Sequence, residues 1–398
     1  MSPTCRNRLM LLVLVLVGIN MRPLLTSIGP LLPQLQQASG MGFTLVSLLT
    51  AIPVIAMGFL ALASPWTDRL ISERRGVVLS LMVIAAGALL REFAPRSGLL
   101  LSSALLGGIG IGIIQATIPA VIKRQFPHRT PQVMGLWSAA LMGGGGLGAA
   151  LTPWLAQHSA VWYHALAWWA LPAVAALFGW WSVSRRPSAA PHPVGASVTA
   201  PVFRRRRAWT LGLYFGLING GYTSLIAWLP PYYMQSGHSA QFSGTLLAIM
   251  TVGQTAGALL IPMLARHDDR RRLLLLTLLL QLIGFCGFIW LPLQVPQLWA
   301  MSCGIGLGGA FPLCLVLALD HARQPAIAGR LVAFMQGIGF IVAGASPWLS
   351  GLLRSLSGNY VLDWALHAVC VIVLMGITLR FIPARYPHAW RQPEPAVD

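Results

Sequence analysis

The chain has 398 residues, of which 56% are hydrophobic and 9% are charged, and its mean hydropathy is +0.70. Soluble domains carry about 25% charged residues, so this composition excludes an ordinary soluble protein and predicts an integral membrane protein. Lys and Arg outnumber Asp and Glu by 27 to 9, which gives a net charge of +18, and the positions of the basic residues decide whether that charge indicates nucleic-acid binding.

Apolar segments of helix length follow one another along the whole chain and predict an all-α integral membrane protein with twelve transmembrane helices. We place them near residues 8–32, 44–63, 76–93, 99–122, 132–155, 162–183, 208–232, 241–264, 273–292, 296–319, 328–353 and 360–382. The first segment begins like a secretory signal. It is longer than a signal core and lacks an A-x-A-like cleavage site, so we expect it to be retained.

The basic residues are distributed very unevenly between the connections. With a cytoplasmic N-terminus, 23 Lys and Arg fall in the tails and the cytoplasmic connections, and three, Arg91, Arg96 and Arg354, fall outside. This asymmetry follows the positive-inside rule and predicts that both termini are cytoplasmic. The positive charge therefore encodes topology, and we expect no nucleic-acid partner.

Similar sequence motifs recur when the first half of the chain is aligned with the second. LLTSIGPLLP (24–33) lies over GYTSLIAWLP (221–230), and GIGIG (108–112) matches GIGLG (304–308). The repeat predicts two pseudo-symmetric six-helix bundles, and the basic, Pro- and Ala-rich stretch between them reads as a linker. The expected division is an N-terminal bundle at 1–183, a cytoplasmic linker at 184–207, and a C-terminal bundle with a cytoplasmic tail at 208–398.

Arg22 lies inside the first apolar segment, where a charge is unexpected. It is about 13 residues into the segment, or roughly 20 Å, which is near the middle of a hydrocarbon core about 30 Å thick. All nine acidic residues fall in loops, tails or the ends of spans, so none is an obvious partner. A central arginine costs at least about 2.5–3.5 kcal/mol, and an anionic substrate would compensate it. The alternative is compensation by amides, water or the carbonyls freed by Pro23 and Pro30.

The repeat also predicts what faces this arginine. At an offset of 197, Arg22 falls on Asn219, and Tyr222 follows on the same helical face, as Thr26 follows close to Arg22. A cation among neutral hydrogen-bond donors suits a small anion. The substrate-binding residues that we expect are Arg22, Thr26, Asn219, Tyr222, Gln254, Gln336 and Gln115. For each glutamine, a bond between helices is the alternative.

The glycine runs MGGGGLGAALTP (142–153) and GIGLGGAFP (304–312) are interpreted as packing surfaces that let helices approach and slide. No strand precedes them and no GK[ST] follows, so a phosphate loop is not expected. Five cysteines show no metal or redox spacing, and we expect free thiols. No metal or cofactor is expected.

Four stretches together resemble one transporter family: MRPLLTSIGPLLPQL, GLWSAALMGGGGLGAALTPWL, FGLINGGYTSLIAWLP and GGAFPLCLVLALDH. They resemble the cyanate and nitroimidazole transporters of the major facilitator superfamily, in particular the cyanate permease branch. The resemblance covers the chain apart from the linker and the tails. It implies the major facilitator fold, a monomer in the bacterial inner membrane, and transport of a small anion such as cyanate by alternating access around a central site.

The first cytoplasmic connection, SPWTDRLISERRG (64–76), resembles the facilitator signature between helices two and three, without its usual glycines. The resemblance implies that Asp68 and Arg69 take part in holding the outward-facing state together at the cytoplasmic side. The alternative is a solvated loop that only sets topology.

Other functions fit the sequence less well. Export of neutral organic compounds, as in the nitroimidazole branch, is the alternative within transport, and a lone arginine weighs against it. No nucleophile and base or metal cluster is evident at depth, so we expect no enzyme. A receptor or scaffold would not need a charge at the midplane. Since no carboxylate is expected within the spans, uniport or anion-linked coupling is the simplest mechanism, and His164 and His367 are the first candidates if protons are carried.

Overall fold

The computed structural model describes residues 3–28, 31–41, 43–70, 72–93, 96–184, 202–322 and 324–386. These residues form helices and their connections, with no strand among them. The α-helices are α1 Pro3–Asn20, α2 Pro23–Thr26, α3 Leu32–Ser39, α4 Phe43–Leu70, α5 Glu73–Leu90, α6 Ser97–Gln125, α7 Thr130–His158, α8 His164–Ala167, α9 Ala170–Val183, α10 Arg206–Gln235, α11 Ala240–Met263, α12 Arg271–Trp290, α13 Pro296–Asp320, α14 Pro325–Ser357 and α15 Val361–Thr378. Short 3-10 helices lie at Arg91–Phe93, Pro127–Arg129, Val202–Arg204 and Pro383–Arg385.

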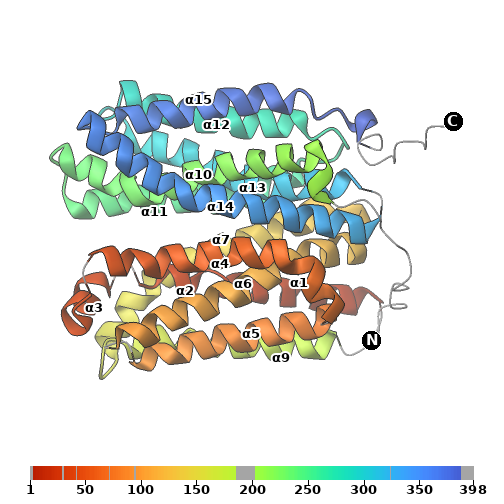
Figure 1. Cartoon of the computed structure of the whole chain (residues 1–398), viewed down its shortest axis with the longest axis horizontal. Helices are drawn as coiled ribbons and strands as arrows, with labels where there is room; N and C mark the ends of the chain where they lie inside the picture. Colours follow the sequence, from red (N-terminus) through yellow and green to blue (C-terminus); the bar gives the residue numbers. More distant parts are fainter. Residues whose placement is uncertain are drawn as a thin grey trace.

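The long helices run side by side along the longest axis of the molecule (Figure 1). In the described ranges, ten helical stretches are long and apolar enough to cross a membrane. Two further helices lie among them: α4, with a shorter apolar stretch at Ala51–Ala63, and α10, which carries more polar residues. Together they make the expected twelve spans. The start of α1 and the end of α15 lie at one end of the molecule, here called the termini end.

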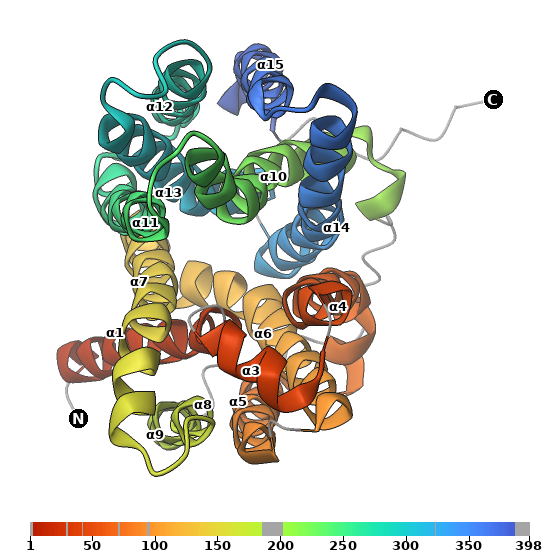
Figure 2. The same cartoon turned by 90° about the vertical axis from the view of Figure 1, so that its left-hand side faces the viewer.

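The helices form two bundles, α1–α9 and α10–α15 (Figures 1 and 2). Contacts in one bundle are repeated in the other: α4 packs on α6 as α11 packs on α13, α1 on α7 as α10 on α14, and α5 on α9 as α12 on α15. Between the bundles, α7 packs on α11 and α4 packs on α14. Exchanging the two halves turns one of these interfaces into the other, which confirms two pseudo-symmetric bundles.

The glycine repeat occupies equivalent places in the two bundles. A Cβ at Gly108 of α6 would lie 2.6 Å from Pro53 Cα, and one at Gly304 of α13 would lie 3.0 Å from the Met250 carbonyl carbon. Such distances exclude any side chain larger than hydrogen, because the backbones themselves are in contact. Pro53 and Met250 are 197 residues apart, the offset that aligns Arg22 with Asn219. The glycine runs therefore pack helices closely, as expected.

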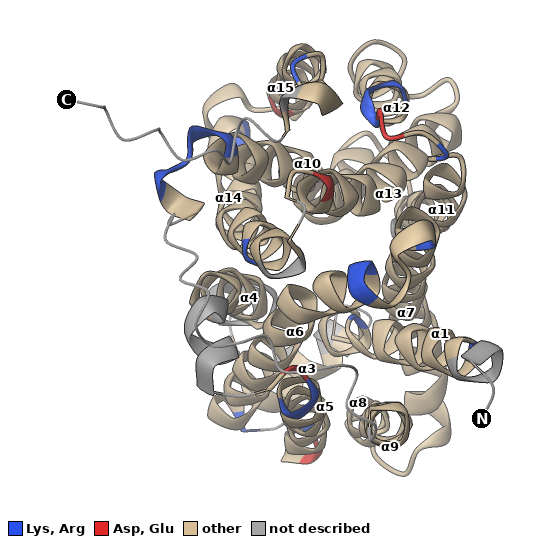
Figure 3. Ribbon diagram, turned by 90° about the vertical axis from the view of Figure 1, so that its right-hand side faces the viewer, with Lys and Arg blue, Asp and Glu red and all other residues tan. Residues whose placement is uncertain are grey.

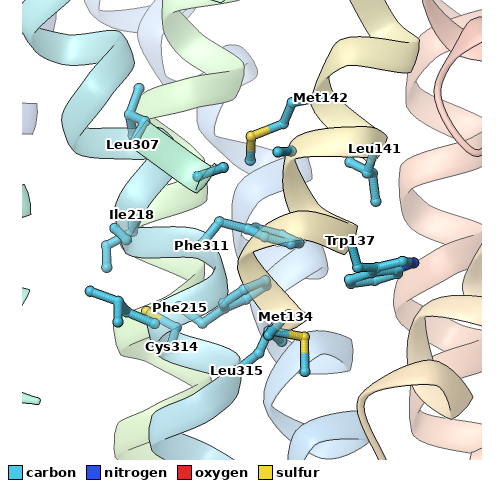
Figure 4. Close-up of a cluster of buried hydrophobic side chains, with 14 of the residues drawn as sticks. Met134, Trp137, Leu141, Met142, Phe215, Ile218, Leu307, Phe311, Cys314 and Leu315 are labelled. Atoms are coloured by element: carbon cyan, nitrogen blue, oxygen red, sulfur yellow. The ribbon is translucent and has the colours of Figure 1, made fainter. Parts of the chain in front are cut away.

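The interface between the bundles is largely apolar near α7. Met134 and Met142 of α7 lie on the side of Phe311 and Leu315 of α13, whereas Trp137 points to the opposite side of α7 (Figure 4). All five side chains are buried in one continuous core. Apolar contacts without interlocking hydrogen bonds suit a surface along which two bundles move.

Several expected boundaries differ from the observed ones. The first span was expected to continue from residue 8 to 32, but α1 ends at Asn20 and the short α2 covers only Pro23–Thr26. The second was expected to end at 63, but α4 continues to Leu70, through part of the expected loop. Residues 185–201 of the expected linker lie outside the described residues. The end of the second span was placed too early because polar residues lower the hydropathy at 64–70. Helix formation does not require apolar side chains, so the helix continues through them.

Candidate substrate site

The first span is broken at Arg22. Met21 N–H donates to Gly18 O at 3.1 Å, and a new helix, α2, begins at Pro23. Proline has no N–H to continue the hydrogen-bond ladder, while the Arg22 backbone itself stays helical (φ −108°, ψ −27°). The missing donor, which the sequence indicates, contributes to an interruption that the expected continuous span did not include, and Arg22 lies between the two helical segments.

Small residues of α7 make room for this broken span. A Cβ at Gly148 would lie 2.7 Å from Pro23 Cα, and one at Gly144 would lie 2.8 Å from the Ile19 carbonyl carbon. Gly145 lies beside Arg22, since a Cβ there would be 3.3 Å from the arginine Cβ. The glycine run therefore seats α1 and α2 against α7 and fixes the backbone that carries Arg22.

Arg22 reaches across to the other bundle. Its NH1 donates to the Tyr222 hydroxyl at 3.4 Å, a long hydrogen bond, and its guanidinium carbon lies 5.6 Å from the centre of the Tyr222 ring. Among the described residues, no carboxylate pairs with Arg22 and its buried Nε has no hydrogen-bond partner. The side chain is partly exposed. One cation thus retains donors for an anion at the junction of the bundles.

Thr26 and Asn219, two further residues of the expected set, are near Arg22 and Tyr222 in sequence. Both form hydrogen bonds within their own helices. Thr26 Oγ1 donates to Arg22 O at 3.2 Å, so its hydroxyl supports the break. Asn219 Nδ2 donates to Phe215 O at 2.8 Å, one turn back in α10. The repeat pairs Asn219 with Arg22 in sequence, but the amide nitrogen of Asn219 is directed along its own helix.

The three glutamines divide into a pair and a single residue. Gln336 Nε2 of α14 donates to the Gln115 carbonyl of α6 at 3.2 Å, which links the two bundles. Both side chains are at most 1% exposed, and three of their amide atoms, Gln115 Nε2 and Oε1 and Gln336 Oε1, lack partners within the described part of the chain. Gln254 is buried in α11, where its backbone packs on Gly308, and no contact joins it to Arg22 among the described residues.

A fully buried arginine, Arg91, was not expected as part of the site. Sequence reasoning counted it among exposed residues of an outer connection, but it is 1% exposed. It donates to Leu24 O at 2.6 Å, to Ser27 Oγ at 3.1 Å and to Ser103 Oγ at 3.2 Å. Leu24 O lies in the last turn of α2, where carbonyls lack helical donors, so Arg91 caps that end of the broken span and ties it to α6.

One acidic residue is also placed differently from expectation. Asp363 lies at the start of a span, as its sequence position predicts, but its side chain is turned inward and has no exposed surface. The expectation that no carboxylate is buried among the spans is therefore wrong. Its neighbour is His367, whose Nε2 lies 3.5 Å from Asp363 Oδ1.

Ion pairs gather at the termini end, where Lys and Arg dominate the helix ends (Figure 3). Arg124 of α6 pairs with Glu73 of α5 at 2.5 Å, and Arg270 pairs with Asp320 of α13 at 2.9 Å. These two pairs occupy equivalent positions in the two bundles with the signs exchanged. They staple neighbouring helices within each bundle. Asp68 and Arg69, the expected gating residues, lie in α4, and their side chains are outside the described residues.

One contact at this end crosses between the bundles. Lys123 Nζ of α6 donates to Leu319 O and, at 2.9 Å, to Ala322 O, both at the end of α13. A cation at a helix C-terminus satisfies free carbonyls and interacts favourably with the helix dipole. Lys123 therefore joins the two bundles at the termini end.

At the termini end, outside the spans, the pKa values of His321 and Asp269 are both lowered from their ordinary values. Burial lowers the pKa of His321 to about 4, so its Nε2 is neutral and accepts a hydrogen bond from Arg207 Nε at 3.0 Å. The Arg271 side chain bonds to Asp269 and lowers the pKa of that carboxyl. These contacts order the charged end of the C-terminal bundle at neutral pH.

The comparisons with known proteins agree with this architecture. The Major Facilitator Superfamily profile matches residues 10–347. The chain belongs to the major facilitator superfamily. Its members and its relatives are membrane transporters, and the protein is a transporter rather than an enzyme.

Individual relatives within this superfamily differ widely in their similarity to the chain. The chain is 70% identical to the cyanate transport protein CynX of Escherichia coli (strain K12), over 96% of this chain and 99% of that protein. It is 27% identical to the 2-nitroimidazole transporter of the same organism, over 93% of each. The solved structure of the proton:xylose symporter XylE superposes with a TM-score of 0.80 and 13% identity, covering 96% of this chain and 97% of that one, and this likeness shows the fold alone.

Proposed function

We propose that this protein carries cyanate across the bacterial inner membrane as a secondary transporter, with the anion held by Arg22 at the junction of the two bundles. The observation that carries the proposal is an arginine without a carboxylate partner in the described residues, bonded weakly to Tyr222 of the opposite bundle. The 70% identity to a cyanate transport protein supports cyanate as the anion. The relative that transports a nitroimidazole is distant by comparison.

The two contacts of Arg22 suit a small linear anion. Cyanate bears charge at both its oxygen and its nitrogen, and so accepts hydrogen bonds at both ends. A guanidinium offers several N–H donors and a phenol offers one. Since Arg22 and Tyr222 belong to different bundles, an anion between them has partners on both sides of the junction. Alternating access requires a site of this kind.

Uptake of labelled cyanate into proteoliposomes tests this function. We expect saturable uptake that unlabelled cyanate suppresses and that a neutral nitroimidazole does not. Liposomes without protein supply the passive background. Equal transport of the nitroimidazole, or uptake no faster than the background, would favour the export function over the anion function.

The remaining substrate and gating roles are proposals of the same kind. We assign Thr26 and Asn219 to shaping the Arg22 site, and Gln336, Gln115 and Gln254 to the path of the anion between the bundles. Asp68 and Arg69 are proposed to stabilise the outward-facing state. The Lys123 bond to the end of α13 acts with them, because opening of the termini end separates α6 from α13.

The orientation proposed is that both termini are cytoplasmic. The basic residues at the termini end motivate it through the positive-inside rule. A reporter fused after residue 190 is expected to be active only in the cytoplasm, and one fused near Ser97 only in the periplasm. Alkaline phosphatase and green fluorescent protein fusions measure the two sides. The reverse pattern would overturn the orientation.

A further inference from the structure

Asp363 and His367 form a buried acid–base pair that is separate from the Arg22 site. The Asp363 side chain is 0% exposed and the His367 side chain 6%, and the facing atoms are 3.5 Å apart. In the described ranges, neither carboxylate oxygen nor His367 Nε2 has a hydrogen bond of normal geometry. Burying an isolated carboxylate without hydrogen bonds is costly, and a bound proton removes that cost. The pair is therefore suited to hold a proton that it shares.

The helices packed against α15 bring mainly neutral groups to this pair. From α12, the Phe285 ring stacks on the His367 ring at 5.4 Å between centroids. From α14, the Ser350 hydroxyl faces the Asp363 carboxylate without the geometry of a full hydrogen bond. From α10, Gly221 lies against His367, since a Cβ there would be 3.8 Å from Nδ1.

The charged and phenolic groups at this end have other contacts. The Arg354 guanidinium lies over the Tyr360 ring at 4.9 Å and the Trp228 ring at 6.0 Å, and Tyr232 donates to Phe288 O at 2.9 Å. The Tyr360 hydroxyl has no partner among the described residues. No further carboxylate pairs with His367 there. Proton binding at the pair thus depends on Asp363 and His367 themselves.

One turn of α10 connects the pair to the anion site. Gly221 contacts His367, and the next residue, Tyr222, contacts Arg22. Ser224, on the same side as Gly221, bonds to Ser350 Oγ at 2.8 Å and to Ser346 Oγ at 3.0 Å. Hydroxyls and packed backbone therefore form a continuous chain of contacts from this pair to the helix that carries Tyr222.

We propose that Asp363 and His367 bind a proton that crosses the membrane together with the anion held by Arg22. The inference rests on the proposed anion transport and deepens it. The pair takes a proton from water on the side from which the anion enters and returns it to water on the other side, with no other bond made or broken. An inside-negative potential opposes entry of an anion, and a proton carried with it cancels the charge. This coupling replaces the uniport expected from the sequence.

The test measures protons and cyanate together in proteoliposomes with the voltage clamped at zero by potassium and valinomycin. An internal pH dye reports proton movement, and labelled cyanate reports uptake and cyanate–cyanate exchange. Wild type is expected to move about one proton per anion, so a gradient of about one pH unit supports accumulation of about tenfold. Asp363→Asn is expected to retain exchange, to move no protons and to accumulate no cyanate above equilibrium.

A matched control is the pair formed by Glu92 and His164, a second carboxylate–histidine pair among the described residues. Their side chains are 37% and 35% exposed, so Glu92→Gln should leave the proton ratio unchanged. His367→Gln is the second variant at the buried pair, and we expect it to lower the ratio as well.

The outcomes distinguish failure of the proposed proton site from failure of the proposed anion transport. Wild type that exchanges cyanate without moving protons would overturn the proton site and leave the transport function intact. Wild-type coupling retained in Asp363→Asn or, where that variant does not fold, in His367→Gln would also overturn it. Absence of cyanate exchange in the wild type would sink the anion function and the proton site together.

Discussion

Arg22→Ala is expected to abolish cyanate uptake while the protein stays folded and at least as stable as the wild type. Arg22 has one long hydrogen bond, to Tyr222, and its Nε has no partner among the described residues. A partly buried charge with so few contacts does not stabilise the fold. The bound anion loses its cation, and truncating one partner of such a pair costs about 2–5 kcal/mol, or about 30- to several-thousand-fold in affinity.

Two substitutions refine this expectation. Arg22→Lys keeps a charge but loses the planar set of donors, so we expect severe impairment rather than complete loss. Tyr222→Phe removes one neutral hydroxyl, for which a loss of about 0.5–1.5 kcal/mol is typical, and we expect weakened but measurable uptake.

Thermal unfolding in detergent measures the stability of the wild type and of Arg22→Ala. Cyanate should raise the melting temperature of the wild type and leave that of Arg22→Ala unchanged, because a ligand stabilises only the state that binds it. A destabilised Arg22→Ala protein whose folded fraction still transports cyanate would show that Arg22 is structural. The anion site would then lie elsewhere.

Arg91→Ala is expected to have the opposite effect on stability. Arg91 makes hydrogen bonds to Leu24 O, Ser27 Oγ and Ser103 Oγ, and it is fully buried. Removing it opens a cavity and leaves these neutral acceptors without a donor, at a typical cost of about 1–3 kcal/mol for a buried group left unsatisfied, so the protein should be clearly destabilised. Uptake should fall with the folded fraction, because α2 loses the cap that fixes it to α6.

The matched control for Arg91 lies five residues along the chain. Arg96 is exposed near the same end of the molecule, so Arg96→Ala should leave the free energy of unfolding within about 0.5 kcal/mol of the wild-type value and the melting temperature nearly unchanged. Arg91→Lys should be intermediate, since an ammonium cannot reach all three acceptors with the same geometry. Equal melting temperatures for Arg91→Ala and Arg96→Ala would mean that Arg91 does not hold the broken span.

The sequence by itself determined the architecture and singled out Arg22 as a charge within a span. Hydropathy located the spans, and the internal repeat predicted two bundles. The repeated glycine motifs pack equivalent helices in the two bundles. Pro23 was expected to free carbonyls beside Arg22, and the repeat pointed to Tyr222, whose hydroxyl accepts a hydrogen bond from Arg22. These features depend on composition, periodicity and proline chemistry, which are local properties of each segment.

Only the tertiary structure decided how residues near the helix ends are used. Arg91 and Asp363 both lie within a turn of a span end, where sequence predicts exposure, yet both side chains are buried. Gln336 was found to bond to Gln115, whereas Gln254 packs on its own bundle. The reason is that burial near a helix end depends on the rotation of the helix and on which distant helices pack beside it. Hydropathy along a single segment contains neither quantity.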